Sequence, residues 1–296
     1  MGATTRRETR AQKTDNGSVT LDAARVALDK LDARLRILLP EQYQEAYESV
    51  KPVSMGTAGL KFAADGTVAW DEIWQSFCDL AMAGGPPHKG VLLAPGDPAE
   101  IAEQRQNYDA VVDEICRGIW LAADLPAQGD AHPGWVRVQC HSATMADWLS
   151  RAIVMENVAA RSSGVMLFLP AAPAFRLEKH IKNVVTVIAK TAHYWMGHMS
   201  RSQKALIADL FMTMAMESPL IEPAIDGWAK WRGVPCPSVG AAVWMMRALV
   251  AFNIVARREQ QTVLVPIADD QDPEGAITAD AIARVRQLAG LRGVWE

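Results

Sequence analysis

Apolar side chains recur at spacings of three and four residues along much of the chain, the pattern of amphipathic helices. Residues 19–39 carry such a stripe, from Leu21 to Leu38, immediately before Pro40. The same spacing predicts helices over residues 70–83 and 97–124. Asp65-Gly66 stands between two short alternating runs and predicts a hairpin. The first part of the chain is therefore expected to be mainly helical, with a small hairpin.

Two later stretches repeat one another. Residues 135–170 and 231–266 align without a gap at a constant offset of 96, and 13 of the 36 positions are identical. Rare residue types match in register, so chance does not explain the likeness. The identities include Trp135/Trp231, Cys140/Cys236, Ser142/Ser238, Trp148/Trp244, Arg151/Arg247, Asn157/Asn253, Arg161/Arg257 and Pro170/Pro266.

Each copy has the pattern strand, helix, strand, strand. Ser142 is placed to cap the helix, and Asn157 stands where a left-handed turn should end it. A further helix follows each copy, at residues 175–199 and 279–291, while residues 203–217 form a helix between the copies. The first strand of the second copy is doubtful, because Gly233 and Pro235 interrupt it.

The predicted fold is α+β: tandem β-α-β-β-α, half ferredoxin-like repeats related by a pseudo-twofold axis, after a mostly helical N-terminal region with a small hairpin. Five segments are expected. They are a disordered leader (1–17), the mainly helical region (18–130), the first α+β repeat (131–200), a connecting helix and linker (201–228) and the second α+β repeat (229–296).

Composition narrows the functional classes. Half of the 296 residues are hydrophobic, 22% are charged and the net charge is −4, so the strongly basic footprint of a nucleic-acid-binding domain is missing. The chain has no apolar run of 18 residues and no apolar signal-peptide core near residue 1, so we expect a cytoplasmic protein with no membrane contact. The four cysteines are far apart, which favours reduced thiols.

A cationic stripe is the first candidate site. Lys179, Lys182, Thr186, Lys190 and His193 lie opposite the apolar face of the helix over residues 175–199, with no acidic residue along the stripe. A solvated helix face is the favoured interpretation, because charged residues opposite an apolar face are the rule. In the alternative interpretation the lysines bind a phosphate or carboxylate group, and the histidine moves a proton.

The second candidate is the loop at residues 84–90, GGPPHKG. Glycines allow backbone amides to approach a ligand, but this loop lacks the Walker pattern and also works as a plain helix stop. If the loop meets the stripe in space, His88, Lys89, Lys182, Lys190 and His193 form one cationic pocket. That pocket is a hypothesis.

We expect neither a metal ion nor a cofactor. His193 and His198 are five positions apart, about 140° around an α-helix, so they cannot share an ion unless the helix breaks. Cys140 and Cys236 could meet at the pseudo-twofold axis, but buried thiols explain them better. The recurring arginines are better explained by structural pairing with carboxylates or carbonyls than by one symmetric ligand.

Two functional hypotheses follow. The first is a non-catalytic binding or assembly and maturation accessory protein with an anion-receptive groove. The alternative is an enzyme acting on a phosphorylated or carboxylated metabolite through Lys182 or Lys190 and His88 or His193. The expected partner is a protein or an anionic small molecule. A homodimer is an option, and nucleic acid is the least favoured partner.

Overall fold

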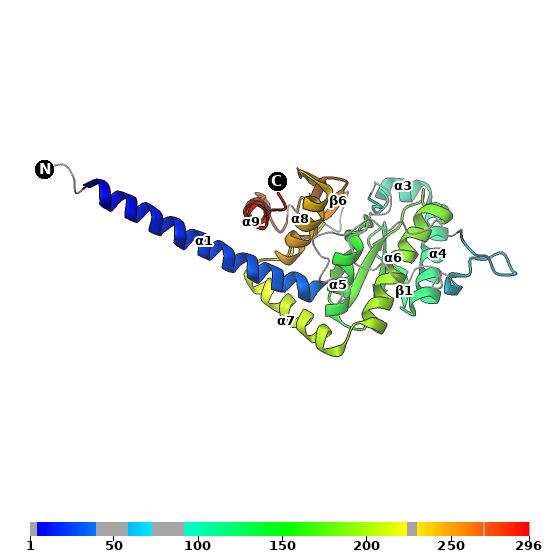
Figure 1. The fold of residues 1–296 in the computed structure, drawn as a ribbon. Helices are drawn as coiled ribbons and strands as arrows, with labels where there is room; N and C mark the ends of the chain where they lie inside the picture. Colours follow the sequence, from blue (N-terminus) through cyan, green and yellow to red (C-terminus); the bar gives the residue numbers. More distant parts are fainter. Residues whose placement is uncertain (1–4, 40–58, 73–91, 224–229, 269, 296) are drawn as a thin grey trace.

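The computed structural model describes residues 5–39, 59–72, 92–223, 230–268 and 270–295, with side chains from residue 21 onward. It shows a mixed α+β fold in which helices surround two small antiparallel sheets (Figure 1). Most of the predicted helix over residues 70–83 lies outside the described residues, as do His88 and Lys89. The hairpin turn is present, since Phe62 pairs with Val68 across Asp65-Gly66.

The first sheet has the strand order β1-β2-β4-β3. Its strands are β1 (Ala127–Gly129), β2 (Trp135–Gln139), β3 (Arg161–Ser163) and β4 (Met166–Pro170). Val136 and Leu169 join the main core beneath the helices, whereas Trp135 and Phe168 form a small cluster on the opposite face. Because β1 pairs with β2, the boundary expected near residue 130 falls inside a hairpin.

The second sheet has the order β5-β7-β6. Its strands are β5 (Trp231–Pro235), β6 (Arg257–Glu259) and β7 (Thr262–Pro266). Trp231 faces Pro266 in this sheet, as Trp135 faces Pro170 in the first. The strand that we doubted does form. Since β5 is an edge strand, Pro235 is tolerated there.

Two asparagines end the central helices of these units, α5 (Ala143–Val154) and α8 (Val239–Ala251). Asn157 and Asn253 have φ angles of 60° and 65°, in the left-handed region predicted for them. An upstream residue then pairs with each turn: Leu93 bridges Val158, and Ile221 bridges Ile254. The related segments at 92–95 (LLAP) and 220–223 (LIEP) are the sequence signal for this bridge.

Polar side chains connect the two units. Arg151 donates a hydrogen bond of 2.8 Å to Asn253 Oδ1, and Arg257 donates one of 3.3 Å to Asn157 Oδ1. Arg161 binds Glu222 Oε1 at 3.2 Å and the carbonyl of Pro223. These three arginines therefore have the structural partners that the favoured interpretation required.

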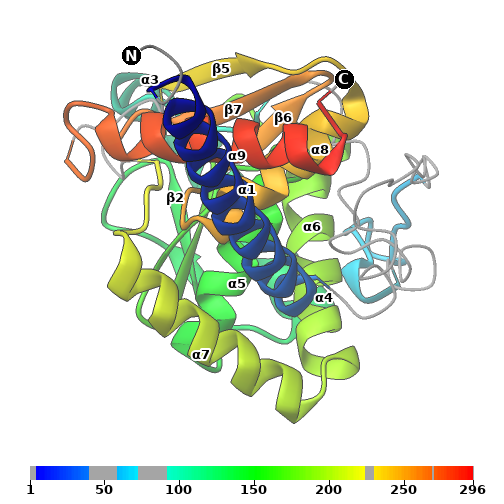
Figure 2. The same cartoon turned by 60° about the vertical axis from the view of Figure 1, so that its left-hand side comes forward.

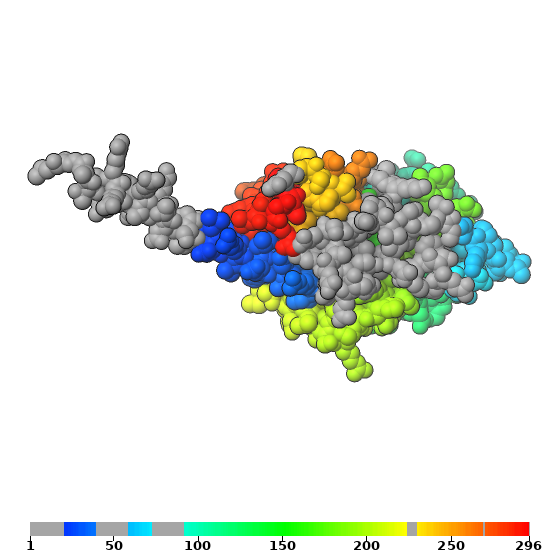
Figure 3. Space-filling view, viewed as in Figure 1, coloured from blue at the N-terminus to red at the C-terminus, as the bar shows by residue number. Residues whose placement is uncertain are grey.

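Helices flank these units on both sides. α1 (Thr5–Leu38) packs against α7 (Arg201–Glu217) and α9 (Ala276–Arg292). It lies between them in Figure 3, and Figure 2 shows it crossing α9. Trp148 anchors the end of α1 by donating its indole N–H to the carbonyl of Leu38 at 3.2 Å. The backbone of α1 is helical from Thr5, within the segment expected to be a disordered leader.

The helices before the first sheet are α3 (Pro98–Glu103) and α4 (Arg105–Ala123). Asp97 caps α3 as predicted, accepting hydrogen bonds from the backbone of Ala99 and Glu100. The single helix expected over residues 97–124 breaks at Gln104, whose φ and ψ angles are −117° and 39°. The second piece, α4, packs against β1 and against α6 (Lys182–His193).

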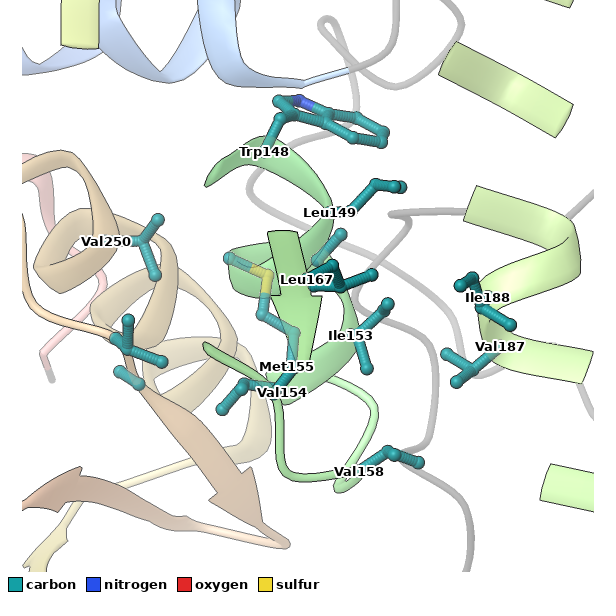
Figure 4. Close-up of a cluster of buried hydrophobic side chains, with 14 of the residues drawn as sticks. Trp148, Leu149, Ile153, Val154, Met155, Val158, Leu167, Val187, Ile188 and Val250 are labelled. Atoms are coloured by element: carbon teal, nitrogen blue, oxygen red, sulfur yellow. The ribbon is translucent and has the colours of Figure 1, made fainter. Parts of the chain in front are cut away.

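The core is continuous across both units, and α5 lies at its centre. Figure 4 shows α5 between α6, which contributes Val187 and Ile188, and α8, which contributes Val250. Trp148 and Leu149 of α5 are fully buried. Within the described ranges, no helix is long and apolar enough to cross a bilayer.

Candidate functional site

The predicted cationic stripe lies on one continuous helical rod. The rod consists of a π-helical turn, η2 (Leu177–Ile181), then α6 and a second π-helical turn, η3 (Tyr194–His198). Its predicted apolar face is present, since Ile181, Val184 and Ile188 are buried. The rod packs against α4 and α5, which fixes the direction in which its polar side chains point.

Burial divides the stripe into two parts. Lys190 and Thr186 are only 4% and 3% exposed, so the middle of α6 is not a solvated face. Lys179, in contrast, is exposed, and Lys182 and His193 are half-buried. The described part of the stripe therefore has a basic end and a histidine end. His88 and Lys89 lie outside the described residues, so the single cationic pocket stays a hypothesis.

Lys190 forms an ion pair with Glu156, the last residue before the left-handed turn after α5. We expected the stripe to lack a compensating carboxylate, because no acidic residue occurs along it. That expectation is wrong for Lys190, since the carboxylate comes from another element. Sequence spacing within one helix cannot reveal such a partner, 34 positions away.

The basic end of the rod holds more charge than the stripe predicted. Arg176 and His180 accompany Lys179 and Lys182, and we call these four side chains the basic turn. Partial burial lowers the pKa of His180, and the positive charges of Lys179 and Arg176 lower it further. The sequence signal for this end is the density of basic residues in RLEKHIK at 176–182. Arg176 and His180 do not lie along the predicted stripe, so that stripe does not include them.

The histidine end of the rod departs from α-helical geometry. His193 Nε2 and His198 Nε2 are 3.1 Å apart, with ring centroids separated by 5.0 Å. Partial burial lowers the pKa of His193, and the neighbouring His198 lowers it further. In an α-helix these histidines would point in different directions, as expected from their spacing. The helix changes to a π-turn at Tyr194, and this change in geometry brings the two rings together.

The cysteines show no sign of a shared site. Burial raises the pKa of Cys140 to about 12 and also raises the pKa of Cys236, which keeps both thiols protonated. Cys236 Sγ packs 3.7 Å from Met245 Sδ, as a small apolar side chain does. Among the residues with described side chains, no three His, Cys, Asp or Glu groups are placed to hold a metal ion together.

Comparison with protein-family models, with curated proteins and with solved structures finds no match to this chain.

Proposed function

We propose that the protein is a non-catalytic binding or assembly and maturation accessory protein that receives an anionic ligand or partner at the basic turn. The observation that carries the proposal is the clustering of Arg176, Lys179, His180 and Lys182 within seven residues of the rod. The cations of this cluster are Arg176, Lys179 and Lys182. Cations on a folded rod favour an acidic group, because binding it requires little reorganisation.

The charge balance supports this assignment. In the part of the chain that the structure describes, no carboxylate forms an ion pair with Arg176 or Lys179. Glu178 is the one acid of the first π-turn. The rod begins at Leu177, so the positive end of its helix dipole adds to the potential at Arg176 and Lys179. An incoming anion would therefore meet a local positive field on a chain whose net charge is negative.

The enzyme alternative needs a lysine and a histidine that reach one small substrate. Lys182 and His193 lie eleven positions apart on the rod, which corresponds to about 16 Å along an α-helix. Lys190 lies closer to His193, but it is buried in its ion pair with Glu156. The described geometry therefore favours binding over acid and base catalysis, and the enzyme acting on a phosphorylated or carboxylated metabolite stays the alternative.

We also propose that the β-α-β-β-α units are copies of one half ferredoxin-like module, related by a pseudo-twofold axis. The equivalent strand registers at Trp135 and Trp231 support it, as do the equivalent left-handed turns at Asn157 and Asn253. A duplicated scaffold explains the shared architecture. The rod after the first unit then carries the function, because two of the three arginines of its counterpart α9 are paired with carboxylates, Arg284 with Asp280 and Arg292 with Asp32.

Binding of two anionic probes tests the function. Inorganic pyrophosphate represents a small anion and a poly-glutamate peptide represents an acidic protein surface. Titration calorimetry at several salt concentrations should show binding of one probe that weakens as salt rises. The double variant Lys179→Ala/Lys182→Ala should lose about tenfold in affinity, which corresponds to about 1.4 kcal/mol.

The matched control is Lys230→Ala/Arg232→Ala, which removes the same charge from two exposed positions of the second unit. It should change the affinity less than twofold. Equal losses in both double variants would show that only net charge matters and would contradict a site at the basic turn. If neither pyrophosphate nor the poly-glutamate peptide binds, the site at the basic turn is also contradicted.

A further inference from the structure

The geometry of the second π-turn points to a site that the basic turn does not include. A π-helix closes its turn with an i to i+5 hydrogen bond, so residues five positions apart come to lie one above the other. Met199 N donates to the carbonyl of Tyr194 at 3.0 Å, and this bond closes such a turn. His193 and His198 are separated by the same interval, and their Nε2 atoms face each other at 3.1 Å.

Aromatic side chains of the second π-turn and of α5 pack beneath the His198 ring. The His198 ring stacks on Tyr194 with an interplanar angle of 15° and a centroid distance of 5.9 Å. Tyr194 in turn stacks on Trp148, which is fully buried in α5. Trp195 packs against Trp148 from the same turn. The His198 ring is thus linked to the core through Tyr194 and Trp148, and it contacts His193, while His198 itself remains exposed and open to a ligand.

We propose that His193 Nε2 and His198 Nε2 bind one divalent transition-metal ion of the late first row. Two imidazole ligands at about 2.0–2.1 Å from a tetrahedral zinc ion stand about 3.3 Å apart. Neighbouring ligands of a square-planar copper ion at similar bond lengths stand about 2.9 Å apart. The observed 3.1 Å separation, a hydrogen bond between the two nitrogen atoms, lies between these values, so the separation suits either metal once the ion has replaced the shared proton.

The donor set selects the class of metal. Imidazole nitrogen suits copper, zinc and nickel, whereas magnesium and calcium prefer oxygen ligands. By the usual order of stability, copper(II) should bind more tightly than zinc(II). Two protein ligands leave the other coordination positions to water or to a donor atom of a bound molecule, as in sites that keep an open position.

This site does not rest on the proposed function. The basic turn and the histidine pair lie at opposite ends of α6, so a variant of one leaves the other intact. Failure of metal binding would leave anion binding untouched, and the reverse also holds.

The test is titration of the full chain with copper(II) and, separately, zinc(II), in competition with a chromophoric indicator. We expect one equivalent of copper to bind, and His193→Gln and His198→Gln each to weaken binding at least tenfold. The control is His132→Gln. His132 is the imidazole that faces Asp130 Oδ1 at 2.9 Å in an exposed turn, and its variant should bind within twofold of the wild type.

Electron paramagnetic resonance of the copper complex supplies a second readout. The wild-type spectrum should show coupling to two imidazole nitrogens, and the His198→Gln spectrum to one. His198 is exposed, so its variant should keep the wild-type circular dichroism spectrum and melting temperature. The proposal is overturned if the affinity is the same in the wild type and both histidine variants, or if the wild-type spectrum shows a single imidazole nitrogen.

Discussion

Lys190 of α6 and Glu156 of the turn after α5 form a buried ion pair that ties the rod to the first α+β unit. The Lys190 side chain is 3% exposed and the Glu156 side chain 16%. A lysine that spacing alone assigns to an anion-binding stripe is therefore part of the framework. Lys190 lies on the rod between the basic turn and the two histidines, and its ion pair with Glu156 keeps its side chain out of both.

Breaking this ion pair from one side should destabilise the fold. Glu156→Gln leaves the ammonium group of Lys190 buried without its carboxylate, which typically costs about 3–5 kcal/mol. Lys190→Met should cost less, because an apolar chain of similar length fills the same space. The double variant Glu156→Gln/Lys190→Met should lose less free energy of unfolding than the sum of the losses of the two single variants. Urea unfolding of all four proteins measures the coupling.

The control for that cycle is Asp280→Asn, which breaks the exposed pair between Asp280 and Arg284 on α9. Exposed pairs contribute about 0–1 kcal/mol, so this change should be nearly neutral. If Glu156→Gln were equally neutral, the pair would not hold the rod, and Lys190 would be free to serve a ligand.

The backbone could be predicted from the sequence further than the site could. Ser142, Asn157 and Asp97 act locally, so their capping and turn roles can be inferred from neighbouring residues. Lys190 pairs with Glu156, and Leu93 bridges Val158. Both contacts join residues far apart in the chain, and the spacing of residues within one helix or strand gives no information about them. The π-turn at Tyr194 was missed because a period of 3.6 residues was assumed throughout the helix.

The two left-handed asparagines should differ in importance. Asn253 accepts a hydrogen bond from Arg151 and donates one of 2.8 Å to the carbonyl of Ser218, whereas Asn157 accepts one of 3.3 Å from Arg257. Glycine keeps the φ angle but removes the side chain. Asn253→Gly should therefore cost about 1–3 kcal/mol, and more than Asn157→Gly.

The single variants Asn157→Ala and Asn253→Ala provide the comparison. Each should be less stable than the glycine variant at the same position, because alanine adds the strain of a positive φ angle to the lost hydrogen bonds. Thermal unfolding ranks the four variants. A larger loss for Asn157→Gly than for Asn253→Gly would show that the hydrogen bonds of Asn253 are not what stabilises its turn.

Asp272 should make the start of α9 sensitive to acid. Burial raises the pKa of this carboxyl, but hydrogen bonds from Thr278, Ile277 and Ala276 outweigh it and leave the pKa lowered. Because the pKa is lowered in the folded state, the ionised carboxylate of Asp272 stabilises the fold fully above the unfolded-state pKa of about 3.9. This stabilisation is lost as the pH falls through the folded-state pKa. Asp272→Asn should lower the free energy of unfolding at pH 7 by about 1 kcal/mol.

The difference between Asp272→Asn and the wild type should shrink between pH 4 and pH 2, which urea unfolding at a series of pH values measures. Asp270→Asn is the control, because Asp270 is exposed two positions earlier. A constant difference down to pH 2 would mean that the charge of Asp272 does not stabilise α9.

Binding at the basic turn is tested most directly by a two-dimensional amide NMR titration of the full chain with whichever of pyrophosphate and the poly-glutamate peptide binds. We predict that the largest shifts fall on residues 176–182 and disappear in Lys179→Ala/Lys182→Ala. Shifts centred on another basic surface, such as Arg284 and Arg286 of α9, or unchanged shifts in the double variant, would contradict the account.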